Sequence, residues 1–197
     1  MATQVVDTST FLCLNPSQWW DFNNAAGGTA HIACSAQLAE QVLVKVTMGA
    51  KLTEHYLAVR PPASPGCEEQ YVWLYSIYDG KRYTWGDGLV IPCTWKVGDS
   101  VTATSHEGSP LTGYPLRMTL TLVKSGTSSP PAGTSFPPNT TFEAAEIQHV
   151  VVDAVLGTKL IEAKSSFAMG LGPYAIAGQT YGVPFVLRIQ KWGGGAT

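Results

Sequence analysis

The stretch LRMTLTL at residues 116–122 alternates apolar side chains with charged or hydroxyl side chains at every position. In an extended chain its four apolar residues would lie on one side, and Arg117 and the two threonines would lie on the other. A period of two is typical of a β-strand that buries one face and leaves the other in water. This stretch therefore predicts a sheet rather than a helical fold.

The same alternation recurs along most of the chain. It is clearest at residues 42–48 and 183–190, where the early Pro184 suits a strand start or an edge. Turn signals such as Asp79-Gly80 fall between the apolar stretches. About ten short strands are expected in one domain spanning residues 1–197, which predicts an all-β fold, a β-sandwich or barrel of jelly-roll type. The further candidate strands cover residues 4–14, 29–35, 70–78, 82–85, 89–95, 100–106 and 159–169.

Residues 140–156 break this rule and predict one amphipathic helix. Polar residues recur there every three or four positions, and apolar residues fill the other side. Thr140 with Glu143 resembles a capping box, and Gly157 stands where a helix would stop. The β-branched residues at 150–152 leave a strand as the alternative.

Two segments are expected to lie outside the regular structure. Residues 125–139, SGTSSPPAGTSFPPN, have the composition of a linker or an extended arm. Residues 193–197 are rich in glycine and are expected to form a flexible tail. Asn139 begins an Asn-Thr-Thr glycosylation pattern that coincides with the expected helix start.

The composition is poor in charge. Charged residues make up 13% of the 197 residues and the formal net charge is −2, whereas roughly 25% charged residues is typical of soluble domains. A near-neutral surface of this kind favours association. The balance of 12 basic and 14 acidic residues argues against nucleic acid as a primary partner, and no apolar run is long enough for a spanning helix. The expected partners are copies of the chain, other subunits of an assembly, or a glycan.

The N-terminus lacks the charged and apolar regions of a signal peptide. Synthesis in the cytosol is expected, followed by incorporation into a virion or by release. The four cysteines are Cys13, Cys34, Cys67 and Cys93, and no two of them form a Cys-x-x-Cys pair. In a cytosolic protein the default is four reduced thiols, with two disulfides as the alternative.

No catalytic motif is present in the sequence. Nucleophile elbows, phosphate-binding loops, dinucleotide fingerprints and zinc-protease motifs are all missing. Ser105 with His106 and Asp99 could be arranged as a triad, but such residue types occur in almost any chain. We therefore expect no enzyme activity, no cofactor and no metal site.

The first candidate binding surface is the aromatic group Trp19, Trp20 and Phe22, within the polar stretch NPSQWWDFNN. Such residues could project to meet a sugar, a lipid headgroup layer or a neighbouring subunit. The alternative is an apolar plug that closes one end of the fold.

The second candidate surface is formed by Tyr75, Tyr83 and Trp85, with Asp87 as a polar contact. If one face of this hairpin is exposed, the three rings could form a platform that stacks on sugar rings. The alternative is a strand pair that is buried on both faces.

These observations predict a non-enzymatic structural protein that self-assembles through its charge-poor surface, such as a virion coat or decoration subunit. One alternative is a carbohydrate-binding, lectin-like module that uses the exposed aromatic residues. A second alternative is a membrane-docking or pore-forming protein.

Overall fold

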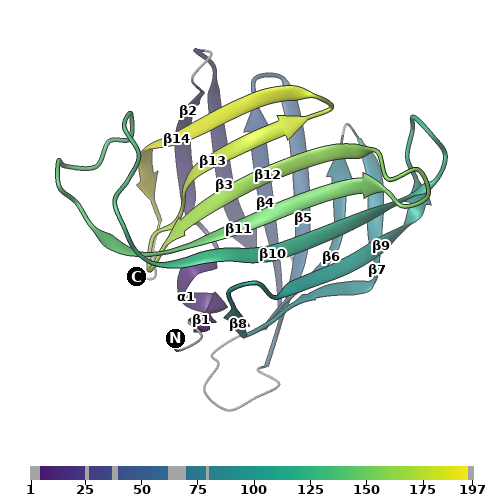
Figure 1. Ribbon diagram of the computed structural model, residues 1–197, viewed down its shortest axis with the longest axis horizontal. Helices are drawn as coiled ribbons and strands as arrows, with labels where there is room; N and C mark the ends of the chain where they lie inside the picture. Colours follow the sequence, from purple (N-terminus) through teal and green to yellow (C-terminus); the bar gives the residue numbers. More distant parts are fainter. Residues whose placement is uncertain (1–4, 25–26, 37–39, 62–69, 79, 195–197) are drawn as a thin grey trace.

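A computed structural model describes residues 5–24, 27–36, 40–61, 70–78 and 80–194. Twelve antiparallel strands form one closed barrel in the order β10-β11-β12-β13-β14-β2-β3-β4-β5-β6-β7-β9 (Figure 1). The barrel strands are β2 Trp19–Asn24, β3 Thr29–Ala36, β4 Gln41–Met48, β5 Lys51–Arg60, β6 Gln70–Tyr78, β7 Lys81–Ile91, β9 Ser100–Gly108, β10 Pro115–Ser128, β11 Phe142–Asp153, β12 Lys159–Ala168, β13 Gly172–Thr180 and β14 Val183–Gly193.

The topology confirms an all-β protein and corrects its finer architecture. Every barrel strand pairs with its neighbour along the chain, and β14 pairs with β2 to close the ring. A jelly roll would instead divide the strands between two sheets joined by long crossovers, so the jelly-roll expectation is wrong. Closure leaves none of these strands as an exposed edge.

The helix expected at residues 140–156 is also wrong, because residues Phe142–Asp153 form strand β11. This strand pairs along its length with β10 and β12. Its inward positions include His149 and Asp153 beside the apolar Val151, and its outward positions include Glu146. Because polar side chains lie on both faces of this strand, polar residues recur every three or four positions, which is also the spacing of an amphipathic helix. Thr140 donates its hydroxyl to the carbonyl of Pro137 and caps no helix.

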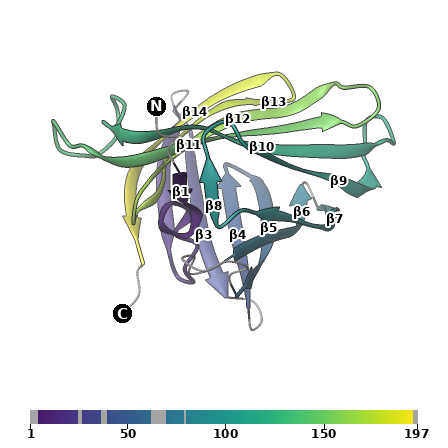
Figure 2. The same cartoon turned by 60° about the horizontal axis from the view of Figure 1, so that its bottom comes forward.

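One end of the barrel is closed by the N-terminal segment. Strand β1, Val5–Asp7, pairs with β8, Thr94–Lys96, and the short helix α1, Thr8–Leu12, follows directly. Figure 2 shows α1, β1 and β8 close together between the walls of the barrel. Phe11 and Leu12 of α1 are buried and join the core. Within the described ranges, no helix has the length and apolar character needed to span a membrane.

The expected arm at residues 125–139 has two parts in the structure. Residues 125–128 belong to strand β10, and the remainder forms a loop attached to β14. The backbone N–H of Ser135 donates to the carbonyl of Ile189, and Gln190 donates to the carbonyl of Gly133. Phe136 packs on Phe142 and stacks with Trp192. In the expected tail, Gly193 ends β14, and residues 195–197 lie outside the described residues.

The cysteines differ from the default expectation of four reduced thiols. Cys93 is disulfide-bonded, while Cys13 and Cys34 are free and buried. Cys67 lies outside the described residues. The expectation that every thiol is reduced is therefore wrong for Cys93.

Candidate functional site

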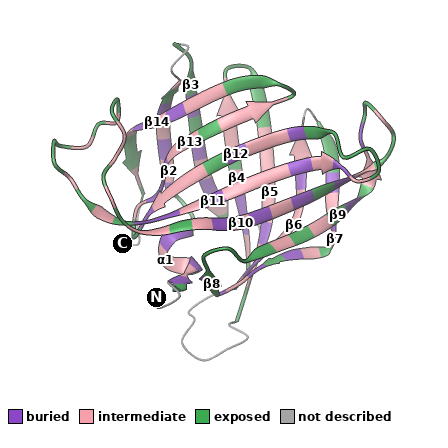
Figure 3. Cartoon of the chain, in the orientation of Figure 1, coloured by how far each residue is buried: buried purple, intermediate pink, exposed green. Residues whose placement is uncertain are grey.

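The structure separates the predicted aromatic residues into inward and outward sets. Trp20, Phe22, Tyr83 and Trp85 point into the barrel, where each is at most 3% exposed. These four rings belong to the core and do not form an exposed binding surface. Burial colours show the alternation along these strands (Figure 3). Trp19, Tyr75 and Asp87 lie on the outer surface.

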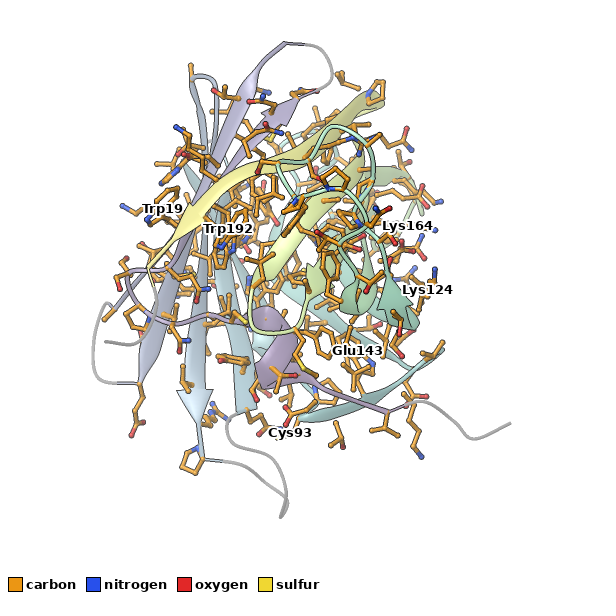
Figure 4. All side chains as sticks on the ribbon, turned by 90° about the vertical axis from the view of Figure 1, so that its left-hand side faces the viewer. Trp19, Cys93, Lys124, Glu143, Lys164 and Trp192 are labelled. Carbon is orange, nitrogen blue, oxygen red and sulfur yellow. The ribbon has the colours of Figure 1, made fainter. Side chains whose placement is uncertain are left out.

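Trp19 lies in a shallow groove on the outer face of β2 and β3. Register places Trp19 opposite Ala33 and places Asp21 opposite His31, so all four side chains share this face. The rings of Trp19 and His31 are stacked, with centroids 6.2 Å apart and planes inclined by 27°. The groove has a volume of about 380 Å³ and is lined by Ser17, Gln18, Trp19, Asp21, His31, Ala33 and Cys34. Figure 4 shows Trp19 on the outer side of this wall.

The polar groups of the groove are held in fixed positions. Nδ1 of His31 lies 2.6 Å from Oδ1 of Asp21, which fixes the orientation of the imidazole and leaves its Nε2 for another partner. The Gln18 side chain points the other way, into the barrel, where its Nε2 reaches the carbonyl of Leu171 at 3.5 Å. The buried Trp20 donates its indole N–H to the same carbonyl. Gln18 is 7% exposed, so its side-chain amide is not part of the polar surface of the groove.

Gly193 provides the space that the Trp19 ring occupies. A Cβ atom at position 193 would lie 2.8 Å from Cζ2 of Trp19 and 2.9 Å from its Cε2. Position 193 pairs with position 19 across the β14–β2 ladder. Only glycine at this position therefore lets the indole lie flat against the neighbouring strand.

A second set of aromatic residues lies on the outer face of β5, β6 and β7. Tyr56 and Tyr75 are stacked with centroids 4.3 Å apart, and the guanidinium of Arg82 lies 3.8 Å from the Tyr75 ring centroid. The hydroxyl of Tyr56 donates to Glu54. One face of Tyr75 is thus occupied by Tyr56, and its ring also carries a cation–π contact. Tyr83 and Trp85 do not join this platform.

Inside the barrel, two histidines are kept neutral by burial. Burial lowers the pKa of His55 to about 3, with a smaller contribution from His149, and burial alone lowers the pKa of His149 to about 4. Nδ1 of His55 lies 3.0 Å from the hydroxyl of Ser76. Nε2 of His149 has no hydrogen-bond partner within the described part of the chain. Both histidines are therefore neutral at neutral pH.

The possible Ser105, His106 and Asp99 triad is not assembled. The Ser105 hydroxyl donates to the carbonyl of Glu107 and accepts from the N–H of Leu116. Nε2 of His106 lies 3.2 Å from the carbonyl of Gly86 rather than near Ser105. Across the described ranges, no group of three or more His, Cys, Asp or Glu side chains could hold a metal ion.

Asp21 and His31 are not among the site residues that the sequence predicted. The signal for Asp21 was available, because alternation in WWDF places it on the same face as Trp19. The position of His31 depends on the β2–β3 register, which alternation alone does not determine.

No protein-family model and no curated protein sequence matches this chain. Two solved structures resemble it. One is a protein from Bacteroides fragilis NCTC 9343 described as exported, with a YmcC-like fold, at 10% identity and a TM-score of 0.40, with 94% of this chain and 99% of that chain covered. The other is a protein from Parabacteroides distasonis ATCC 8503 described as a lipoprotein, at 9% identity and a TM-score of 0.39, with 93% and 99% covered.

These comparisons correct two expectations. The matched proteins are described as exported and as a lipoprotein, and neither description names a coat protein. These descriptions contradict the virion coat or decoration interpretation, together with the virion and capsid assignments, and we do not carry that interpretation further. The expectation of a cytosolic protein destined for a virion is contradicted by the same matches. The similarity assigns no ligand and no site residue to this chain.

Proposed function

We propose that this protein binds carbohydrate, without catalysing a reaction, in the groove of Trp19, Asp21 and His31. The observation that carries the proposal is the indole of Trp19 beside a fixed His31–Asp21 pair on one outer face. A volume of about 380 Å³ is near the lower end of the range for small-molecule sites.

The chemistry of the groove suits a sugar ring. An indole offers a flat apolar surface for the C–H face of a pyranose, and its stacking is a contact that needs no charge on the ligand. The carboxylate of Asp21 accepts hydroxyl protons, and the free ring nitrogen of His31 offers a second polar contact.

The platform of Tyr56, Tyr75 and Arg82 is the competing exterior surface. Residues of the same chain already cover the Tyr75 ring of this platform, since Tyr56 stacks on it and Arg82 lies over it. The Trp19 groove instead places an aromatic ring beside the partly exposed polar pair of Asp21 and His31. We therefore assign the glycan to the Trp19 groove.

The test is a glycan array followed by calorimetric titration of any glycan that binds. Loss of the Trp19 ring in Trp19→Ala should weaken binding by about tenfold, because aromatic contacts contribute about 0.5–1.5 kcal/mol beyond burial. Trp19→Phe should retain part of the affinity. Tyr75→Ala is the matched control and should bind as the unmodified protein does. Absence of binding to every glycan, or loss in Tyr75→Ala with Trp19→Ala unaffected, would overturn the proposal.

A further inference from the structure

The end of the barrel opposite α1 contains a small cavity. It is lined by the first residues of β5, β7, β10 and β12 and by the last residues of β6, β11 and β13, so every contributing element meets at this end. The lining residues are Lys51, Thr53, Tyr78, Tyr83, Leu116, Val151, Leu160, Ile161, Thr180 and Tyr181. The cavity therefore lies at the mouth of the barrel, and α1 closes the other end.

The lining is divided by polarity. Leu116, Val151 and Leu160 are buried at the inner side, whereas Lys51 is exposed and Thr53 and Thr180 are half-buried. A ligand that fits this arrangement has an apolar tail and one polar or anionic head. An isolated charge deeper in the barrel would lose its hydration without a compensating partner, and the neutral His55 and His149 provide none.

The size of the cavity restricts the shape of the tail. Its volume is about 70 Å³, roughly half of the 150 Å³ cavity that accommodates benzene in another protein. A sugar ring or a fused ring system is too wide, whereas the end of an unbranched alkyl chain is slim enough to enter. The interior beyond the mouth also keeps some accessible surface, since Trp73, Tyr78, Ile161 and Phe167 are half-buried although they face inward.

The apolar surface continues from the cavity onto its rim. The strand ends and turns at this end carry several of the large hydrophobic side chains that the barrel exposes. They are Leu52, Leu111, Tyr114, Val155, Leu156, Tyr181 and Val183. An exposed apolar cluster around an opening is typical of a binding site.

We propose that the mouth of the barrel binds a small single-chain amphiphile, with the end of its alkyl tail inside the cavity and its anionic head beside Lys51. This site is distinct from the Trp19 groove, which lies on the outer wall of β2 and β3. The chemical class is a short to medium-chain carboxylate.

The test is calorimetric titration of the full-length protein with octanoate and, separately, with 1-octanol. Octanoate should bind saturably. The Thr53→Trp side chain fills the mouth from β5 and should weaken octanoate binding by about tenfold or more. Thr180→Trp fills it from the opposite strand, β13, and provides a second test if Thr53→Trp does not fold. Thr104→Trp places the same ring on the outer face of β9 and is the matched control.

Lys51→Glu separates head recognition from tail recognition. Octanoate affinity should fall by about tenfold, because attraction becomes repulsion near the surface, and 1-octanol affinity should change by less than about twofold. Trp19→Ala should leave octanoate binding unchanged. A failure of the groove proposal can therefore be distinguished from a failure of the proposal for the barrel mouth. No saturable octanoate binding, or full binding by both tryptophan variants, would overturn the inference.

Discussion

The hydroxyl oxygen of Ser76 lies 3.0 Å from Nδ1 of His55 in the centre of the barrel. The same oxygen accepts the indole N–H groups of Trp73 and Trp85, each at 3.0 Å. Since both indoles donate, the Ser76 proton is free to point at Nδ1 of His55. This assignment requires a neutral imidazole with its proton on Nε2, in agreement with the lowered pKa of His55.

Removal of this hydroxyl should destabilise the barrel. Ser76→Ala leaves two indole donors and one imidazole nitrogen without their partner in a site that is 0% exposed. Each unsatisfied buried group costs about 1–3 kcal/mol, and partial relaxation should leave a loss of about 2–4 kcal/mol in the free energy of unfolding, measured by urea titration. Ser100→Ala, which removes an exposed hydroxyl, should change it by less than about 0.5 kcal/mol. Equal effects of the two variants would contradict the central role of Ser76.

Stability should fall as the solution is acidified. An unfolded histidine titrates near pH 6.5, whereas burial holds the pKa of folded His149 at about 4 and that of His55 at about 3. Between these limits the unfolded state binds more protons, so stability decreases as the pH falls and is unaffected by these groups above about 6.5. Each histidine should make the free energy of unfolding about 2 kcal/mol lower at about pH 5 than at about pH 7.

Urea unfolding at both pH values tests this linkage. His149→Phe should remove about half of the difference, since one of the two buried histidines no longer titrates. Phe167→Leu is the control, because it perturbs the core of the same barrel but retains both histidines. An unchanged pH dependence in His149→Phe would show that other groups are responsible.

Alternation predicted the sheet well, because each strand in a barrel has one face inside and one outside. Strand β10 follows the pattern of Leu116 to Leu122 directly, with all four apolar residues buried. The pattern failed where the interior is polar. His149 and Asp153 face inward from β11, and their spacing of four residues led to the prediction of a helix.

The candidate site was predicted only in part for a different reason. Trp19 and Trp20 are adjacent, so a strand must send their rings to opposite faces, and only Trp19 could line an exterior groove. The partners of Trp19 come from β3 and from the turn before β2. Their approach is set by strand register and closure, which are properties of the whole barrel.

The two free thiols should be unreactive in the folded protein. Burial raises the pKa of Cys13 and raises that of Cys34 to about 12, so little of the nucleophilic thiolate is present near pH 8. Iodoacetamide should label neither residue over an hour in buffer, and peptide mapping should find both labelled in guanidinium chloride. Rapid labelling of Cys34 in the native protein would mean that the groove opens to it.

The last prediction tests the geometry of the groove without changing any of its polar groups. In Gly193→Ala the new methyl group would lie 2.8 Å from Cζ2 of Trp19, so the indole must leave its present position. The backbone at 193 is not in the left-handed region, and any loss of glycan affinity would thus come from the ring itself. Titration should give about tenfold weaker binding of whichever glycan the unmodified protein prefers.

Gly28→Ala is the matched control for this substitution. Its methyl group would meet only Cβ of Asn24 at 3.8 Å, an ordinary contact, and its backbone is also outside the left-handed region. It changes a glycine beside β3 without touching Trp19, so glycan binding should be unchanged. If Gly193→Ala binds as tightly as Gly28→Ala, the position of the Trp19 ring against β14 does not matter for binding, and the stacking role of that ring is wrong.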